Sequence, residues 1–324
     1  MGKKAPPLPD LEAMAALTQR IETAATEAPE LACMELDEVL RFIKDKRAIF
    51  AGSFDGTPAI ARFYFDAPRA YAKRDWDELQ RTRAYMSEGP FRVNAPLYHL
   101  PDLGLIVVQR ETGQPMLERV WQAEIDKRFN MMPGAVHWLR HYTQPMERRA
   151  PMRAASWIAK ADKRLGKNAS ARLRPLMRNV RAELERLLPA MDGHAWRVSI
   201  SHGDFHPNNL LVKGDILTGI DTGGSAKLPI YKDMARFLTH MGRRGLHPSG
   251  EVRFGVDRGT FDLFAQVFDL DEAEREIWLP FMIGIEALLR SETPDLTRSR
   301  LRRAQRFYEA LVEDLAAIDS PPRT

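Results

Sequence analysis

The hydrophobic pattern of this chain changes from strand type to helix type about a third of the way along. Between residues 39 and 108, short apolar runs are separated by polar turns such as Asp55-Gly56. Asp-Gly between two such runs is typical of a β-hairpin. Later segments repeat apolar residues every three to four positions, which indicates helices. The pattern predicts an α+β protein with a small antiparallel sheet followed by a larger helix-rich part.

The expected elements divide the chain into three parts. A chain of 324 residues exceeds what one core normally serves, so we expect two lobes. Residues 109–114 become abruptly polar and contain glycine, which places the lobe boundary near Arg110. The predicted organisation is an N-terminal extension and helix over 1–35, an N-lobe over 36–110 and a C-lobe over 111–324. Within it we expect a Pro-rich, disordered start over 1–9, strands over 39–43, 48–51, 58–65 and 103–108, and helices over 11–25, 73–86, 234–241, 261–268, 273–289 and 296–318.

Residues 198–238 hold the candidate chemistry. Two carboxylates and a carboxamide stand at the ends of short apolar runs: Asp204, Asn209 five residues later, and Asp221 after a hairpin turn. Phosphoryl transfer needs a group that orients the attacking hydroxyl and hard oxygen ligands for Mg²⁺. A turn-rich hairpin could also use Asp and Asn only to cap its own main chain. Three such residues at the spacing of a kinase catalytic loop favour the chemical interpretation.

The same residues carry a resemblance to a known family. The segments His202-Gly203-Asp204-Phe205-His206-Pro207-Asn208-Asn209, Ile220-Asp221 and Pro229-Ile230-Tyr231-Lys232-Asp233 resemble the aminoglycoside phosphotransferase and choline kinase group of small-molecule kinases. The match departs from the group's pattern at Lys232, which is inserted before Asp233.

This resemblance implies a bilobal, protein-kinase-like fold and an ATP-dependent transfer of phosphate to the hydroxyl of a small molecule. By the same resemblance, Asp204 is the catalytic base, His202 orients it, Asn209 and Asp221 bind Mg²⁺, and Asp233 anchors the loop. The histidines His202 and His206 are expected to brace the loop and not to bind a metal.

In such a fold the N-lobe binds the nucleotide. Arg62 on the third strand stands where protein kinases carry lysine, and its planar fork can still bind phosphate; a solvated strand residue is the alternative. Glu78, or Glu88 in its place, would hold Arg62 in an ion pair. Residues from Gln109 to Glu111 would receive the adenine. The turn over 43–47 contains no glycine, although phosphate-covering loops are usually rich in glycine. Lys44, Lys46 and Arg47, or the segment 51–53, would then contact the phosphates.

Composition says more about the cellular location of the protein than about its substrate. One cysteine, Cys33, excludes an intramolecular disulfide and a cysteine-based zinc site. No apolar signal core and no run of about 18 apolar residues is visible, so a soluble, cytoplasmic protein without a transmembrane segment is expected. The net charge of +4 says little by itself. Residues 148–186 contain twelve Lys and Arg residues but only three acidic residues. This excess indicates a solvated basic face or contact with an anionic substrate or membrane surface.

The acceptor is left open between a sugar, an amino alcohol and an anionic compound. Because the segments described are basic, they do not favour a polycationic aminoglycoside. Two other functions compete: a catalytically weak or inactive nucleotide-binding regulator, suggested by Arg62 and the glycine-free turn, and a polyanion-binding protein. The arginines of residues 148–186 are not accompanied by aromatic interleaving of the kind that binds nucleic acid, so no nucleic acid partner is expected.

Overall fold

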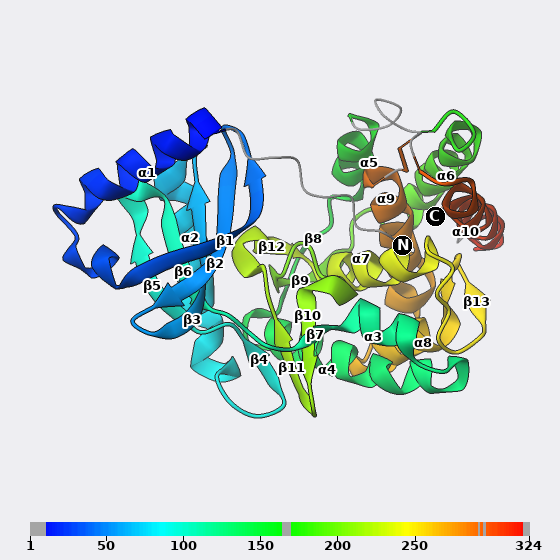
Figure 1. The fold of residues 1–324 in the computed structure, drawn as a ribbon. Coiled ribbons are helices and arrows are strands. Elements are labelled where there is room, and N and C mark those ends of the chain that lie inside the picture. Colours follow the sequence, from blue (N-terminus) through cyan, green and yellow to red (C-terminus); the bar gives the residue numbers. More distant parts are fainter. Residues whose placement is uncertain (1–10, 164–169, 291, 294–295, 320–324) are drawn as a thin grey trace. The chain divides into compact units, whose positions relative to one another are not determined.

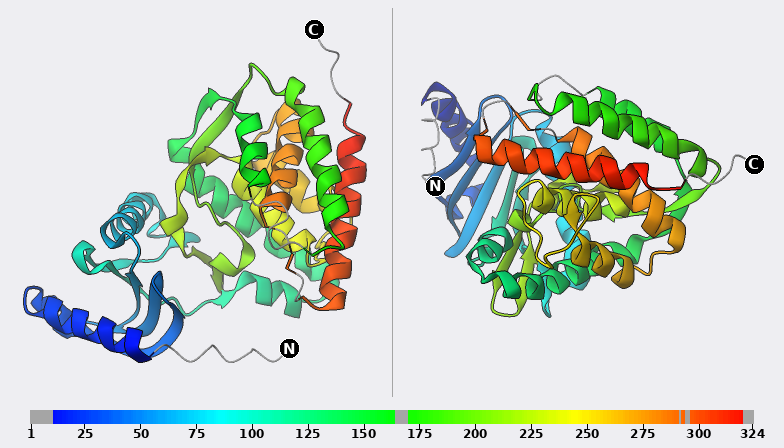
Figure 2. Two further views of the ribbon diagram at one scale, coloured as in Figure 1. Left: turned by 90° about the horizontal axis from the view of Figure 1, so that it is seen from above. Right: turned by 90° about the vertical axis from the view of Figure 1, so that its right-hand side faces the viewer.

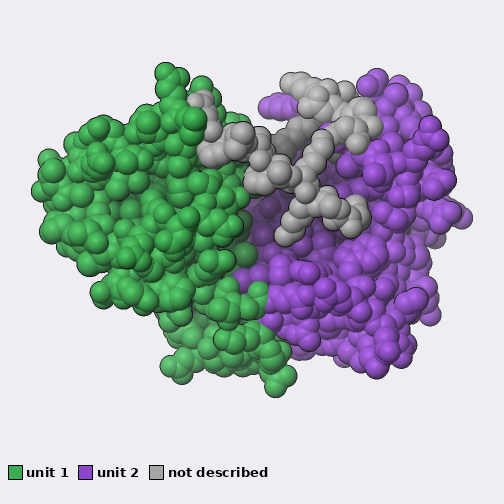
Figure 3. Space-filling model, in the orientation of Figure 1, with its two compact units in different colours: residues 1–113, 213–224 green, residues 114–212, 225–324 purple. Residues whose placement is uncertain are grey.

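The computed structural model describes residues 11–163, 170–290, 292–293 and 296–319 (Figure 1). The predicted disorder over 1–9 and part of the basic segment, residues 164–169, lie outside this range. The chain forms two compact units, which Figure 3 shows in separate colours. Unit 1 contains residues 1–113 and 213–224, and unit 2 contains residues 114–212 and 225–324. The chain therefore enters unit 2, returns to unit 1 for twelve residues, and enters unit 2 again.

Unit 1 is built on a five-stranded antiparallel sheet with the strand order β1-β2-β3-β6-β5. The Asp55-Gly56 turn joins β2 to β3 as predicted, and both residues have positive φ angles of 48° and 70°. The strands expected over 39–43, 48–51, 58–65 and 103–108 are confirmed, with longer or shifted ends. The five strands are β1 (Met34–Ile43), β2 (Arg47–Phe54), β3 (Thr57–Tyr64), β5 (Pro96–Leu100) and β6 (Leu105–Gln109).

Two helices pack on this sheet. Helix α1 (Leu11–Ala25) buries Leu17 in a core with Phe50 and Phe63, whose rings meet edge to face. Helix α2 (Pro68–Met86) packs Ala72 and Leu79 against Ile106 and Val108 of β6. It begins at Pro68, five residues before the predicted start, because proline fits the first turn of a helix.

The segment 213–224 completes unit 1. Strand β11 (Ile216–Gly219) runs parallel to β4 (Phe91–Val93), with Leu217 opposite Phe91 and Gly219 opposite Val93. A short 3₁₀ turn, Thr222–Gly224, then contacts α2. This return brings Asp221 into the unit that carries Arg62.

Unit 2 contains short strands and most of the helices (Figures 1 and 2). Its three-stranded antiparallel sheet has the order β12-β9-β8, and β7 pairs with β10. The strands are β7 (Gln114–Pro115), β8 (Arg148–Pro151), β9 (Ala195–Ser201), β10 (Leu210–Lys213), β12 (Ala226–Pro229), β13 (Val252–Arg253) and β14 (Val256–Asp257). The helices are α3 (Met116–Gln122), α4 (Met132–Thr143), α5 (Ala154–Asp162), α6 (Arg174–Leu187), α7 (Tyr231–Gly242), α8 (Arg258–Val267), α9 (Leu279–Leu289) and α10 (Arg298–Ala316).

The core of unit 2 surrounds α7 and α9, which pack on each other. Every residue of α7 is buried, and α9 is buried over all but its last residue. Because both helices are enclosed, charged groups on them must find partners inside the unit.

The predicted fold class is confirmed: an antiparallel sheet forms the first unit, and helices dominate the second. Within the part of the chain that the structure describes, no helix is both long and apolar enough to cross a membrane.

Candidate active site

An aromatic stack and one carboxylate hold the loop after β9 in place. Phe205 is fully buried between Trp138 of α4 and Phe237 of α7, with ring centroids 5.6 and 5.4 Å away. Asp233, in the first turn of α7, accepts hydrogen bonds from the backbone N–H groups of His202 (2.6 Å) and Gly203 (3.0 Å). The predicted anchoring role of Asp233 is thus confirmed, and the loop is fixed directly next to Asp204.

Asp204 is surrounded by cations. Its Oδ1 accepts from Arg236 Nε at 2.8 Å and lies 3.0 Å from an Arg290 guanidinium nitrogen. Its Oδ2 lies 3.5 Å from His206 Nε2. Burial alone would raise the pKa of Asp204, but the His206 contact and the two arginines lower it well below its usual range. With 41% of its side chain exposed, Asp204 is a fixed carboxylate that solutes can reach.

The histidines of the loop have different surroundings. His202 is fully buried, and its ring lies 6.0 Å from the rings of Trp138 and Tyr142. His206 stacks on His240 of α7 with a centroid distance of 4.5 Å, and burial lowers the pKa of both. The pair is therefore neutral near pH 7 and packs as rings.

Asn209 follows the loop in a short 3₁₀ turn. Its Nδ2 donates to the Asp204 carbonyl at 3.0 Å, so the amide is turned with its nitrogen toward the loop. The Oδ1 atom is then the group available for a metal ion. This oxygen and the Asp221 carboxylate are hard donors of the kind that Mg²⁺ prefers.

In unit 1, Arg62 lies inside a group of acidic and phenolic side chains. Its Nη1 lies 3.1 Å from Asp75 Oδ2, which also accepts from the Tyr64 hydroxyl at 2.9 Å. A second guanidinium nitrogen lies 3.3 Å from Asp221 Oδ1. Burial lowers the pKa of Arg62, but Asp221 and Asp75 together raise it above its ordinary value. Arg62 is 8% exposed, so it is not the solvated strand residue that we kept as an alternative.

The acidic partner of Arg62 in α2 is Asp75, where we predicted Glu78. The Glu78 carboxylate lies three residues further along α2 and binds Arg81 at 2.6 and 3.0 Å. Glu88, the other candidate, lies beyond the end of α2. Asp75 and Glu78 share one helix face, so spacing alone could not separate them. Arg62, Asp75 and Tyr64 are all polar and bind one another, which would identify Asp75 as the partner of Arg62. This grouping is visible only once the fold is known.

Asp221 and Gly223 have backbone features that fit their positions. Asp221 is in the left-handed region with φ of 64°, a strained conformation that is more common at functional sites. A Cβ atom at Gly223 would lie 2.7 Å from Cγ of Asp75, so only glycine fits there. The turn 222–224 therefore closes directly over the carboxylate that holds Arg62.

In the segment expected to bind adenine, residues 109–111, some backbone groups already form other hydrogen bonds. Gln109 donates its N–H to the Ala95 carbonyl at 2.8 Å, and its own carbonyl accepts from Asn94 at 3.2 Å. Among the described residues, the Glu111 main chain has no backbone partner. Of the two residues predicted to contact adenine, Glu111 therefore has the more available backbone.

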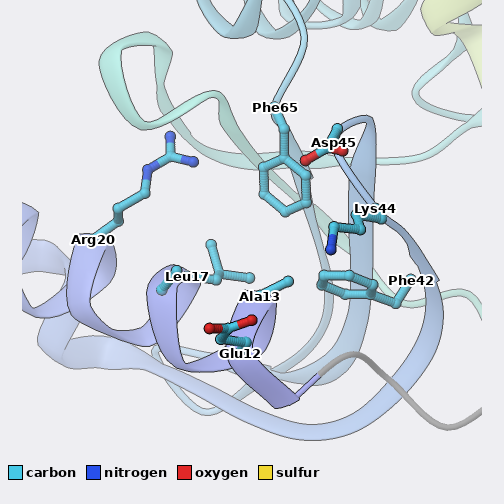
Figure 4. A pocket seen from close by; sticks show the side chains of 9 residues that line it. Glu12, Ala13, Leu17, Arg20, Phe42, Lys44, Asp45 and Phe65 are labelled. Carbon is cyan, nitrogen blue, oxygen red and sulfur yellow. The ribbon is translucent and has the colours of Figure 1, made fainter.

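The turn that joins β1 to β2 is tight and lacks glycine, as the sequence shows. Asp45 takes the left-handed conformation with φ of 57°, and Lys46 N–H closes the turn on the Ile43 carbonyl. Lys44 and Asp45 help line a shallow pocket of about 360 Å³ with Glu12 and Arg20 of α1 (Figure 4). Phe65 points into this pocket. Because Lys44 lines the pocket together with residues of α1, it belongs to the contact between the turn and α1.

The predicted basic segment over 148–186 is partly neutralised within unit 2. Arg181 of α6 binds Asp162 at 2.6 and 3.0 Å and Glu185 at 2.9 Å. Arg186 binds Glu183 and donates to two carbonyl groups near the end of α10. Contact of this segment with a membrane surface stays a prediction.

Arg236 and Arg290 are neighbours of Asp204 that the sequence does not predict. They stand 32 and 86 residues after it in the sequence, on α7 and at the end of α9. No local pattern marks them, although Arg236 follows the Tyr231-Lys232-Asp233 motif by one helical turn.

Comparison with known proteins adds three findings. A sequence model of the phosphotransferase enzyme family matches residues 4–248. A solved choline/ethanolamine kinase family protein from Mesorhizobium loti is 16% identical, with a TM-score of 0.58, and the match covers 93% of this chain and 99% of that chain. No curated protein matches by sequence.

Two further solved structures have the same fold. The aminoglycoside phosphotransferase APH(4)-Ia is 12% identical with a TM-score of 0.57, covering 90% of this chain and 99% of that chain. A microcompartment-associated aminopropanol kinase is 14% identical with a TM-score of 0.57, covering 91% and 96%.

Proposed function

Because the chain belongs to the phosphotransferase enzyme family, we propose that it transfers the γ-phosphate of ATP to a hydroxyl group of a small molecule. Structural relatives include kinases that act on aminopropanol and amicoumacin, the latter solved with AMP-PNP and Ca²⁺. The single observation that carries the proposal is the loop geometry: Asp233 fixes the main chain next to Asp204, whose carboxylate stays ionised and accessible.

In the transfer, the hydroxyl oxygen forms a bond to the γ-phosphorus while the bond to the β–γ bridging oxygen breaks. ADP leaves with that electron pair. The hydroxyl proton is transferred to water by way of Asp204. Because its pKa is low, Asp204 contributes mainly by orienting the hydroxyl, which suits the loose transition state of phosphoryl transfer.

Two side chains carry oxygen donors of the kind that a divalent ion prefers. Asn209, with its Nδ2 committed to the Asp204 carbonyl, and Asp221, with 47% of its side chain exposed, would hold Mg²⁺. When bound, the ion neutralises charge on the β- and γ-phosphates. Arg62, fixed by Asp75 and Tyr64, would bind a phosphate, and the main chain near Glu111 would receive the adenine.

The first test is the thermal melting shift with Mg·ATP and with ATP plus EDTA. A ligand that binds only the native state raises the midpoint, so wild type should show a Mg²⁺-dependent rise. Asp221→Asn should lose it, because asparagine tolerates the left-handed backbone but lacks the charge. Asp215→Asn, on the exposed turn of the same hairpin, is the matched control and should keep the shift.

Turnover separates an enzyme from a nucleotide-binding regulator. ADP release in the presence of acceptor should be lost in Asp204→Ala while the Mg·ATP shift remains. A melting shift without any Asp204-dependent turnover would favour the regulator, and no shift at millimolar ATP would contradict the proposed nucleotide site.

A further inference from the structure

A series of arginines in unit 2 begins at Asp204 and extends beyond the carboxylates that bind its first members. Five arginines, here called the basic stripe, follow one another from the end of α9 across α7 to the start of α10: Arg290, Arg236, Arg244, Arg300 and Arg303. In the views of Figures 1 and 2 these three helices lie together in unit 2, and α9 contacts both others.

The stripe begins at the catalytic carboxylate. Arg236 and Arg290 both bind Asp204 Oδ1, and Arg290 also lies 3.5 Å from Glu286. Glu286 is already bound by Lys232 at 2.9 Å. With the buried Asp233, which also interacts with Lys232, three carboxylates face three cations at this end, so any excess of positive charge lies further along the stripe.

The stripe continues along α7. Arg236, His240 and Arg244 are spaced by four residues, so they lie on one side of the helix and its last turn. Arg244 donates to the His240 carbonyl at 2.7 Å, and neighbouring Arg243 takes the Glu292 carboxylate at 2.6 Å. Burial and the charges of Arg300, Arg243 and Arg236 lower the pKa of Arg244 to about 10.

The far end of the stripe is formed by α10. A Cβ atom at Gly245 would lie 2.8 Å from Cδ of Arg303, so this side chain crosses directly over the end of α7. The Nε atoms of Arg300 and Arg303 are buried without a hydrogen-bond partner among the described residues. The first turn of α10 contains no acidic residue, although helix starts favour negative charge.

Across the described residues, Arg244, Arg300 and Arg303 thus form no ion pair. The charge of Glu292 acts on Arg244, but this carboxylate is bound by Arg243, and Arg236 shares Asp204 with Arg290. Partly buried cations without counter-charges are unfavourable unless a ligand supplies them. Arginine forks match the oxygens of phosphate and carboxylate, and a cationic acceptor would be repelled here.

Building on the proposed phosphotransfer at Asp204, we propose that the acceptor is an anion: an alcohol that already carries a phosphate or carboxylate group, which the basic stripe binds. Arg236 and Arg244 are eight residues apart, about 12 Å along a helix. This length suits a sugar-sized acceptor with its hydroxyl at Asp204 and its anionic group further along the stripe. Arg290 or Arg236 would turn from Asp204 to the acceptor as it binds.

The first experiment measures binding of inorganic phosphate by calorimetry, without nucleotide. Wild type should bind phosphate, and the double variant Arg244→Gln/Arg300→Gln should bind it at least ten-fold more weakly. Arg258→Gln, which removes an exposed arginine of α8, is the matched control and should bind like wild type. Arg244→Lys, which keeps the charge, should retain most of the affinity. Equal binding by wild type and the double variant, or no binding, overturns the proposal.

The second experiment measures ADP release with matched alcohols. The sets are ribose with ribose 5-phosphate, glycerol with glycerol 3-phosphate, and glucosamine with glucose and gluconate. The anionic member of a set should have at least a ten-fold higher kcat/KM than its neutral or cationic relative, and the double variant should lose this preference. The phosphate and carboxylate members distinguish the two anionic groups. A neutral or cationic member that reacts equally well overturns the proposal.

The two proposals fail separately. If the Mg·ATP melting shift is absent, the proposed phosphotransfer fails whatever the stripe binds. If the double variant keeps that shift and still binds phosphate like wild type, the fold is intact and only the anionic acceptor is excluded. If none of the alcohols reacts, the phosphate measurement still decides.

Discussion

Arg62 and Asp75 form a buried ion pair in unit 1, with 3.1 Å between Nη1 and Oδ2 and no solvent exposure of the Asp75 side chain. Tyr64 donates to the same carboxylate oxygen, and Gly223 lies against the carboxyl group. One buried acid therefore fixes the cation of β3 and supports the turn that follows Asp221. Its removal should affect stability and nucleotide binding together.

Asp75→Asn is expected to destabilise the protein by about 3 kcal/mol, because it removes the buried one of the two carboxylates that neutralise Arg62. The KM for ATP should rise as Arg62 loses its orientation. Glu78→Gln is the matched control, since Glu78 binds Arg81, and its KM for ATP should stay at the wild-type value. Urea unfolding and steady-state kinetics measure the two effects. A larger rise in KM for Glu78→Gln would restore Glu78 as the partner of Arg62.

Gly223→Ala should destabilise the protein by about 1–3 kcal/mol, because the new methyl group would press on the Asp75 carboxyl group. In an Asp75→Ala background that obstacle is gone, so the same substitution should cost less. The double-mutant cycle, followed by urea unfolding, should give a clear coupling energy. Strictly additive effects would show that Gly223 is required for another reason.

The stability that Asp204 provides should decrease as the pH falls. Its pKa is lowered in the folded protein, so its contribution is present above the ordinary aspartate pKa of about 3.9 and is lost as pH falls below it. The difference in unfolding free energy between wild type and Asp204→Asn should stay constant from about pH 8 to 5 and shrink below about pH 4. Asp215→Asn, which removes an exposed carboxylate, should show no comparable change. A difference that grows on acidification would contradict the ion pairs at Asp204.

Asp233 and Tyr231 lie two residues apart in α7 and have separable roles. Asp233→Asn removes charge from two backbone hydrogen bonds of the loop after β9. If that loop holds the proposed Asp204 site, the variant should lower both stability and kcat, because small displacements of reacting groups slow transfer strongly. Tyr231→Phe removes the hydrogen bond that the hydroxyl donates to Glu274 and the one that it accepts from the Arg197 N–H, and it should cost about 1–3 kcal/mol while kcat is retained. Loss of kcat in Tyr231→Phe would show that the loop is not held by Asp233 alone.

Much of the fold could be predicted from local patterns. The strands of unit 1 alternate around an Asp-Gly turn, and the loop after β9 is marked by residues at fixed spacing, so both could be found without knowing the fold. The start of α2 is harder to predict, because its N-cap, Ala67, forms no side-chain cap and only Pro68 marks the first turn.

The partners of the site residues could not be predicted, because tertiary packing chooses them. Asp75 and Glu78 lie on the same face of α2, and only the contacts with Tyr64 and Gly223 decide which one meets Arg62. Arg290 reaches Asp204 from 86 residues away, through the packing of α9 on α7. The proposed anionic acceptor likewise rests on arginines from three helices, which no local sequence pattern connects.

The return of residues 213–224 to unit 1 has a consequence for synthesis on the ribosome. Strand β4 pairs with β11, and α2 contacts the turn after Asp221, so the first unit lacks these contacts when residue 113 emerges. It can be completed only after another hundred residues have been translated. During that interval β4 has an unpaired edge and Asp75 lacks its cover, which makes the nascent first unit a natural client for a chaperone. A fragment that stops at the first boundary should for the same reason be difficult to obtain in folded form.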